Sequence, residues 1–165
     1  MFEDESRISN LGESLVSNSI TVKIKKVSNN SLALPAYATA ASAGVDLCAD
    51  LKEALNLSPG ENVKIPTGLA IELPGPHVVA LVFARSGLAS RYGIGLTNGV
   101  GVIDSDYRGE IQVLIQNFGN RPIKVNPGDR IAQMVFMPIF RAVIEEVAEL
   151  EETARGSGGF GSTGI

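Results

Sequence analysis

The carboxyl-terminal segment 155–165, Arg-Gly-Ser-Gly-Gly-Phe-Gly-Ser-Thr-Gly-Ile, combines glycines and hydroxyls with one arginine and one aromatic ring. Glycines let backbone N–H groups turn toward an anion, and the hydroxyls and the guanidinium add further donors. The ring of Phe160 could cover a planar base. These residue types suggest binding of nucleotide phosphates and a nucleobase, although a disordered tail has the same glycine- and serine-rich composition.

A second candidate site lies at 84–89, Ala-Arg-Ser-Gly-Leu-Ala. We predict a short helix over 86–92 with Ser86 as its N-cap, so that backbone N–H groups, a hydroxyl and a guanidinium meet at an anion site. A capped helix beside a surface arginine is the plainer interpretation of the same residues.

A third segment, 98–109, places two carboxylates and an aromatic ring within four residues. Its asparagine and glycines predict a hairpin, on which Asp104 or Asp106 could act as a general base beside a binding slot. Either aspartate could instead only form the turn. The chain has one histidine and one cysteine, which disfavours Ser-His-Asp chemistry and a zinc cluster and leaves a carboxylate that activates water.

The elements that must position these segments are predicted to be half-buried β-strands, because apolar residues alternate with polar or small ones. Asn, Pro and Gly turns separate them at a spacing typical of sandwiches and barrels. The strands are expected around Val22 and Ile24, Val63 and Ile65, Leu69 to Leu73, Ile111 to Ile115, and Ile123 and Val125. A possible helical turn at 51–55 and a strand-like stretch at 135–147 complete the pattern. We predict an all-β jelly roll.

The composition predicts one domain, since 165 residues with 44% hydrophobic content can bury one core. A net charge of −4 argues against partners such as nucleic acid or an anionic membrane. The longest apolar run, 78–84, is too short for a membrane helix, and the N-terminus lacks the basic region of an export signal. We expect a cytoplasmic protein in which Cys48 is a buried small hydrophobe.

Five segments resemble, in order, the signature motifs of the trimeric dUTP pyrophosphatases (dUTPases). They are 43–47 (Ala-Gly-Val-Asp-Leu), 85–87 (Arg-Ser-Gly), 101–109, 128–133 (Gly-Asp-Arg-Ile-Ala-Gln) and 155–164. The resemblance implies a homotrimer of jelly-roll, barrel-like subunits with one short helix and with active sites at the subunit interfaces. The resemblance covers residues 20–165, with a jelly-roll domain at 20–150 and a mobile glycine-rich lid at 151–165. Residues 1–19 are polar and lack periodicity, which predicts a loosely ordered extension.

The activity that the resemblance implies is hydrolysis of dUTP to dUMP and pyrophosphate, which removes dUTP and supplies dUMP for thymidylate synthesis. Asp104 would be the general base for water attack on the α-phosphorus. Mg²⁺ would bridge the triphosphate through waters. Asp46 would support the phosphate and metal network indirectly, and Gln133 would order water or phosphates. The residues that hold phosphate oxygens would be Arg85, Ser86 and Gly87.

Recognition of the nucleoside is also implied by the resemblance. Tyr107 would lie under the deoxyribose, so that the 2′-hydroxyl of a ribonucleotide meets a ring. Gln112, on the following strand, would lie at the border of the nucleotide site. The uracil edge would pair with Asn98 and with the backbone of Gly101, Val102 and Ile103.

The tail would close over the site of another subunit. Phe160 would stack over the uracil, and Arg155 would reach the γ-phosphate. Further phosphate donors would come from Gly161, Ser162 and Thr163. Two alternatives use the same fold: a dCTP deaminase-like enzyme, and a nucleotide-binding module without turnover. The sequence departs from many relatives at Ala84, where they have proline, which loosens the backbone before Arg85.

Overall fold

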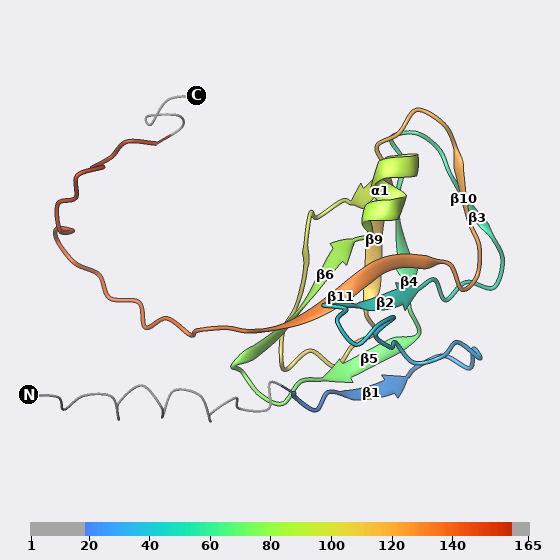
Figure 1. Ribbon diagram of the computed structural model, residues 1–165, viewed down its shortest axis with the longest axis horizontal. Coiled ribbons are helices and arrows are strands. Elements are labelled where there is room, and N and C mark those ends of the chain that lie inside the picture. Colours follow the sequence, from blue (N-terminus) through green and yellow to red (C-terminus); the bar gives the residue numbers. More distant parts are fainter. Residues whose placement is uncertain (1–18, 160–165) are drawn as a thin grey trace, which may run out of the picture.

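The computed structural model describes residues 19–159, in which the regular elements are β-strands apart from one short helix (Figure 1), so the all-β prediction is confirmed. The elements in chain order are β1 (Lys23–Lys26), β2 (Val45–Cys48), β3 (Leu55–Leu57), β4 (Asn62–Pro66), β5 (Leu69–Glu72), β6 (Val78–Ala84), α1 (Ser86–Tyr92), β7 (Ile94–Leu96), β8 (Gly101–Ile103), β9 (Gln112–Asn117), β10 (Ile123–Val125) and β11 (Arg130–Pro138). The five strands predicted between Val22 and Val125 form, and so does the helix at 86–92.

The strands pair in antiparallel fashion in four sheets. The largest has the order β2-β11-β6-β8, a second has the order β4-β9-β7, and β1-β5 and β10-β3 are two-stranded. Buried and exposed residues alternate along β9, as expected for a strand with one face on the core. This arrangement agrees with a jelly roll, but the hydrogen-bonded ladders between residues 19 and 159 do not close into a barrel.

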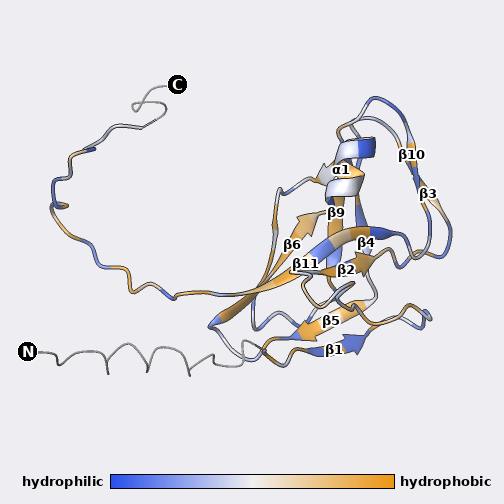
Figure 2. Ribbon diagram, viewed as in Figure 1, coloured by the Kyte–Doolittle hydropathy of each residue, from blue (hydrophilic) through white to orange (hydrophobic). Residues whose placement is uncertain are grey.

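One apolar core lies between the sheets. Leu47 of β2, Leu57 of β3, Ile65 of β4 and Ile71 of β5 all belong to it, so every sheet contributes. Hydrophobic colour gathers on strands such as β5, β6 and β9, whereas β1 is hydrophilic (Figure 2). Burial of each such side chain stabilises the fold by about 2 kcal/mol, so the strands that carry the candidate site residues rest on a rigid support.

Two local predictions about helix structure are wrong. Ser86 is the first helical residue of α1 and not its N-cap; the N-cap position is Arg85, whose backbone is extended because it directly continues β6. The region 51–55 contains a bend at Lys52 and Glu53, and then enters β3. Here Leu57 is fully buried and pairs with Ile123 of β10, which holds the chain extended.

The strand-like prediction for 135–147 holds only as far as Pro138. The last backbone bond from the arm to the body is donated by Ile139 to the His77 carbonyl oxygen, at 2.9 Å. Beyond it, every residue from 140 to 157 is exposed, and the arm leaves the body (Figure 1). Cys48 is half-buried and not buried as predicted. The single helix found between residues 19 and 159 is too short to cross a membrane.

Candidate active site

Three adjacent strands bring a carboxylate, an amide and a guanidinium to one pocket. Asp46 of β2 lies directly opposite Gln133 of β11, and Arg85 follows the end of β6, which pairs with the other edge of β11. The pocket has a volume of about 310 Å³. Its lining residues are Ala38, Ser42, Ala43, Gly44, Asp46, Arg85, Ser86, Gly87, Arg130 and Gln133. Every residue that the sequence assigned to phosphates outside the tail therefore lies here.

The carboxylate of Asp46 lies between two guanidinium groups. Its Oδ1 is 2.8 Å from Arg85 Nε, and its Oδ2 is 3.1 Å from Arg130 Nη1. Arg85 Nη1 also donates to the carbonyl oxygen of Arg130 at 3.3 Å. Two positive charges and one negative charge leave the group at +1, which suits an anionic ligand.

The rest of the pocket is formed by backbone and small residues. Gln133 Nε2 donates to the Ala84 carbonyl oxygen at 3.0 Å, which fixes the orientation of the amide. A Cβ on Gly44 would lie 3.1 Å from a backbone oxygen of β11, so a larger residue there would require β11 to shift. At Gly87 nothing in the described part of the chain lies within 4 Å of a Cβ position, which leaves room for a ligand.

The segment 98–109 does not form the hairpin that we predicted. β8 pairs with β6, whereas the next strand, β9, pairs with β4 and β7, so the segment between them crosses from one sheet to another. Gly101 packs closely on Val82 of β6: a Cβ there would lie 3.1 Å from Val82 Cβ. β8 is the last strand of its sheet, and Val102 on it is 62% exposed.

Tyr107 is held in place by the chain that follows it. Its N–H donates to the Asp104 carbonyl oxygen at 3.1 Å, and its hydroxyl donates to the Glu110 carbonyl oxygen at 3.0 Å. The ring covers Gly109 so closely that a Cβ on this glycine would lie 2.6 Å from Tyr107 Cζ. The ring remains 43% exposed and can contact a ligand. Gln112 Nε2 reaches Glu110 Oε2 at 3.5 Å, so Glu110 supports two candidate site residues that the sequence had singled out.

The two groups of site residues lie far apart within one chain. Ile103 of β8 pairs with Ala80 of β6, and Arg85 lies five residues after Ala80, directly beyond the end of β6. At about 3.3 Å per residue this distance is about 16 Å. Asp104 follows Ile103 and extends away from the phosphate pocket. Within one chain, the pocket that contains Asp46 and Arg85 therefore lies near one end of β6, and Asp104 and Tyr107 lie near the other end.

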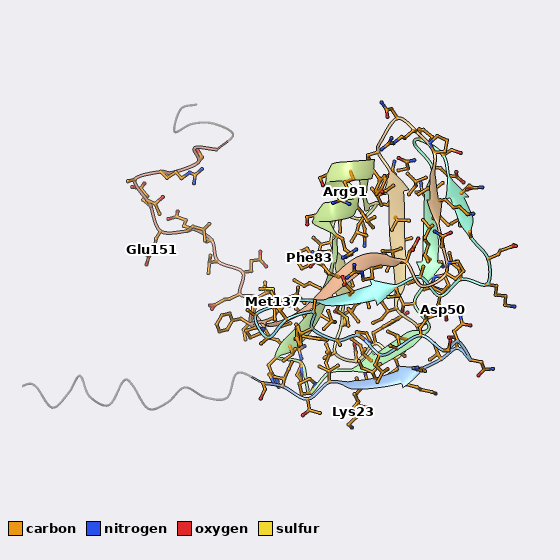
Figure 3. The ribbon with its side chains drawn as sticks, turned by 45° about the vertical axis from the view of Figure 1, so that its right-hand side comes forward. Lys23, Asp50, Phe83, Arg91, Met137 and Glu151 are labelled. Atoms are coloured by element: carbon orange, nitrogen blue, oxygen red, sulfur yellow. The ribbon has the colours of Figure 1, made fainter. Side chains whose placement is uncertain are left out.

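The arm carries Arg155 away from both groups. Figure 3 shows Glu151 on the separate arm, and Met137 where the arm leaves the body. Arg155 Nε donates to the Gly158 carbonyl oxygen at 2.9 Å, and Gly156 N–H reaches Thr153 Oγ1 at 3.2 Å. The structure therefore does not bring Arg155 to the pocket. The remaining predicted tail residues, Phe160, Gly161, Ser162 and Thr163, lie outside the described residues.

Residue types that bind metal do not gather at the pocket. Between residues 19 and 159, no three His, Cys, Asp or Glu side chains form a metal cluster. Both oxygens of Asp46 contact arginines. The pocket therefore fits a cation that is held by the phosphates and waters of a ligand, and it does not fit a cation in a cage of protein ligands.

Two supporting residues were not found by sequence reasoning. Arg130 lies within the motif at 128–133, where its residue type alone indicates no role, and no sequence pattern distinguishes Glu110. Only pairing with Asp46 in space distinguishes Arg130 from other exposed arginines. Burial raises the pKa of the nearby Cys48 thiol, and the Asp46 carboxylate raises it further, while Arg130 and Arg85 oppose the shift.

The fold and this site define an all-β protein with a cationic pocket, from which Asp104 and Tyr107 are separated by most of the length of β6. The family model described as dUTPase matches residues 30–164. The chain is also 60% identical, over 149 residues, to a deoxyuridine 5'-triphosphate nucleotidohydrolase of Desulfitobacterium hafniense, covering 90% of this chain and 99% of the relative. The chain therefore belongs to the dUTPase family.

Solved structures of dUTPases have a similar fold. The dUTPase of Staphylococcus bacteriophage 80alpha, solved with dUPNHPP, is 27% identical with a TM-score of 0.80, covering 89% of this chain and 100% of that chain. A mutant dUTPase from phage phi11 of S. aureus, whose structure shows the coordination of a structural Mg(II) ion, is 25% identical with a TM-score of 0.71. That likeness covers 80% of this chain and 99% of that one.

Proposed function

We propose that this protein hydrolyses dUTP to dUMP and pyrophosphate. The observation that carries the proposal is the pocket lined by Arg85, Ser86, Gly87 and Gln133, in which the Asp46 carboxylate pairs with Arg85 and Arg130. It is a cationic site of the right size for phosphates, in a chain that shares 60% identity with a named deoxyuridine 5'-triphosphate nucleotidohydrolase.

Asp104 acts as the general base. Its carboxylate takes a proton from a water molecule that attacks the α-phosphorus, and the bond from that phosphorus to the bridging oxygen breaks, so pyrophosphate leaves. Arg85 and the start of α1 stabilise the charge that develops on the phosphate oxygens. Tyr107, anchored on the Glu110 carbonyl oxygen, presents its ring to the sugar.

The active site is completed between copies of the chain. The separation of about 16 Å along β6 between Ile103 and Arg85 prevents one copy from bringing Asp104 to its own phosphate pocket. A homotrimer removes this difficulty, because the Asp104 group of one copy can face the pocket of the next. The segment 151–165 closes as a lid and brings Arg155 and Phe160 to the nucleotide.

Mg²⁺ accompanies the substrate. It would be held by the triphosphate and by waters near Asp46, and it would offset the negative charge of the phosphates. Asp46 contributes indirectly, since both of its oxygens already contact arginines.

The test is pyrophosphate release by the purified protein with Mg²⁺, comparing dUTP with dCTP, dTTP and UTP. We expect release from dUTP alone and a loss of at least about a hundredfold in Asp104→Asn. Asp106→Asn is the matched control, because it removes a carboxylate two residues away, and it should retain most activity. Ammonia release from dCTP would instead indicate a deaminase, and binding of dUTP without turnover would indicate a nucleotide-binding module.

A further inference from the structure

Strand β11 contains a β-bulge beside the phosphate pocket. Arg130 pairs with Cys48 of β2 and Ala132 pairs with Leu47, so Ile131 is an extra residue between the two pairs. Ile131 and Ala132 are both buried, with exposures of 2% and 0%. Consecutive residues of a regular strand point to opposite faces, so two consecutive buried residues show that the bulge changes the alternation.

The bulge decides where Arg130 points. Leu47 is fully buried, so its neighbours Asp46 and Cys48 lie on the outer face of β2. Gln133 lies opposite Asp46 on that face, and regular alternation would turn residue 130 of β11 toward the core. With the extra residue, Arg130 lies opposite Cys48 on the outer face, where its guanidinium reaches Asp46.

We propose that Arg130 is a positioning residue that acts through Asp46 on Arg85. Arg130 Nη1 donates to Asp46 Oδ2 at 3.1 Å, and Asp46 Oδ1 forms an ion pair with Arg85 Nε at 2.8 Å. The Arg130 carbonyl oxygen accepts a hydrogen bond from Arg85 Nη1, at 3.3 Å. The ion pair and this hydrogen bond hold the Arg85 guanidinium, whose other N–H groups can bind phosphate.

Loss of the Arg130 side chain would change the geometry of this group. Asp46 would then face Arg85 alone, and a carboxylate and a guanidinium favour a bidentate pairing. Arg85 would rotate toward Asp46 and away from the pocket, and the charge of the group would fall from +1 to zero. Arg130 is largely exposed, so its replacement removes this function without opening a cavity in the core.

The kinetic test rests on the proposed function. We expect Arg130→Met to lower kcat/KM for dUTP by about tenfold to a hundredfold, the cost of a misplaced phosphate-binding group. Arg130→Lys, which keeps the charge, should recover part of the loss. Lys124→Met is the matched control: it removes a cation from the neighbouring cavity that Arg130 also lines, and should stay within about twofold of the parent. An equal loss in Lys124→Met, or no loss in Arg130→Met, would overturn the proposal.

A double-mutant cycle tests whether Arg130 acts through Asp46. If it does, Arg130→Met should have little further effect on kcat/KM once Asp46→Asn is present, because the link to Arg85 is already lost. Effects that multiply would show that Arg130 acts independently and would refute a positioning role.

A structural test does not depend on activity. A crystal structure of Arg130→Met should show the Arg85 guanidinium displaced from its present position, with a changed contact to Asp46. An unchanged pair of Arg85 and Asp46 would overturn the inference even if dUTP is the substrate. If the parent protein fails to cleave dUTP, the proposed function is wrong. The crystal structure of Arg130→Met still tests the positioning role of Arg130 in that case.

Discussion

At the scale of single residues, the site depends on small side chains as much as on charged ones. Gly44 admits the close approach of β11 to the segment before β2, and Gly109 admits the ring of Tyr107. Neither glycine is needed for a left-handed backbone, since neither has a positive φ. Their role is to leave space, which a change to alanine tests directly.

Gly109→Ala should weaken the discrimination between dUTP and UTP. The added Cβ would meet Tyr107 Cζ at 2.6 Å, so the ring must move from the position in which its hydroxyl bonds the Glu110 carbonyl oxygen. We expect kcat/KM for dUTP to fall by about tenfold while that for UTP falls less. Steady-state kinetics with both nucleotides measure the ratio.

Tyr107→Phe serves as the comparison for this prediction. It removes the bond to Glu110 but leaves the ring and the glycine unchanged, so its effect on the ratio should be smaller. Equal ratios in Gly109→Ala and the parent would show that the ring position does not set sugar selectivity.

At the scale of elements, strand β11 ends where Pro138 cannot donate a backbone hydrogen bond, and an arm begins. This arm carries exposed apolar residues such as Phe140 and Val143, together with five glutamates at 145, 146, 149, 151 and 152. The arm and the body are thus distinct: one is exposed along its length and the other has a continuous core.

Truncation after Glu152 should leave the body folded but lower kcat for dUTP by at least about a hundredfold. The described part of the removed segment contributes nothing to the core, whereas Arg155 and Phe160 are the proposed lid residues. Circular dichroism and size-exclusion chromatography report the fold and assembly, and pyrophosphate release reports turnover. Full turnover in the truncated chain would contradict the lid proposal, and Arg155→Met in the full chain should reproduce part of the loss.

At the scale of the whole molecule, the site is divided between the two ends of β6. Gln133 and Asp46 meet near one end because β11 and β2 pair in register, while Asp104 follows a strand that pairs with the other end. This division is the reason for the proposal that the Asp104 group of one copy works with the pocket of another.

Mixed assemblies should therefore recover activity. Asp104→Asn and Arg85→Met are each expected to be inactive alone, but a trimer refolded from both can combine an intact Asp104 from one copy with an intact Arg85 from another. Random mixing in equal amounts makes about one quarter of the sites complete. The measurement is pyrophosphate release before and after mixing, and mixtures of each variant with itself are the controls. No recovery in the mixed sample would place both residues of a working site in one chain.

Much of the fold could be predicted because its determinants are local. Val63 and Ile65, like Val113 and Ile115, are apolar residues separated by one position, a spacing that indicates a strand whatever its partners are. The end of α1 follows from Gly93, which has a left-handed backbone with φ of 69°. The segment of Arg85, Ser86 and Gly87 was identified for the same reason, since its chemistry is visible in three adjacent residues.

The amino-acid sequence by itself determined the strand pattern, the short helix, the five ordered motifs and the candidate residues within each. Only the tertiary structure decided how these parts meet: that 98–109 joins two sheets, that Asp104 lies away from the phosphate pocket, and that a bulge at Ile131 turns Arg130 to Asp46. The physical reason is that local preference acts between neighbours in the chain, whereas strand register and the faces of side chains depend on burying one shared core.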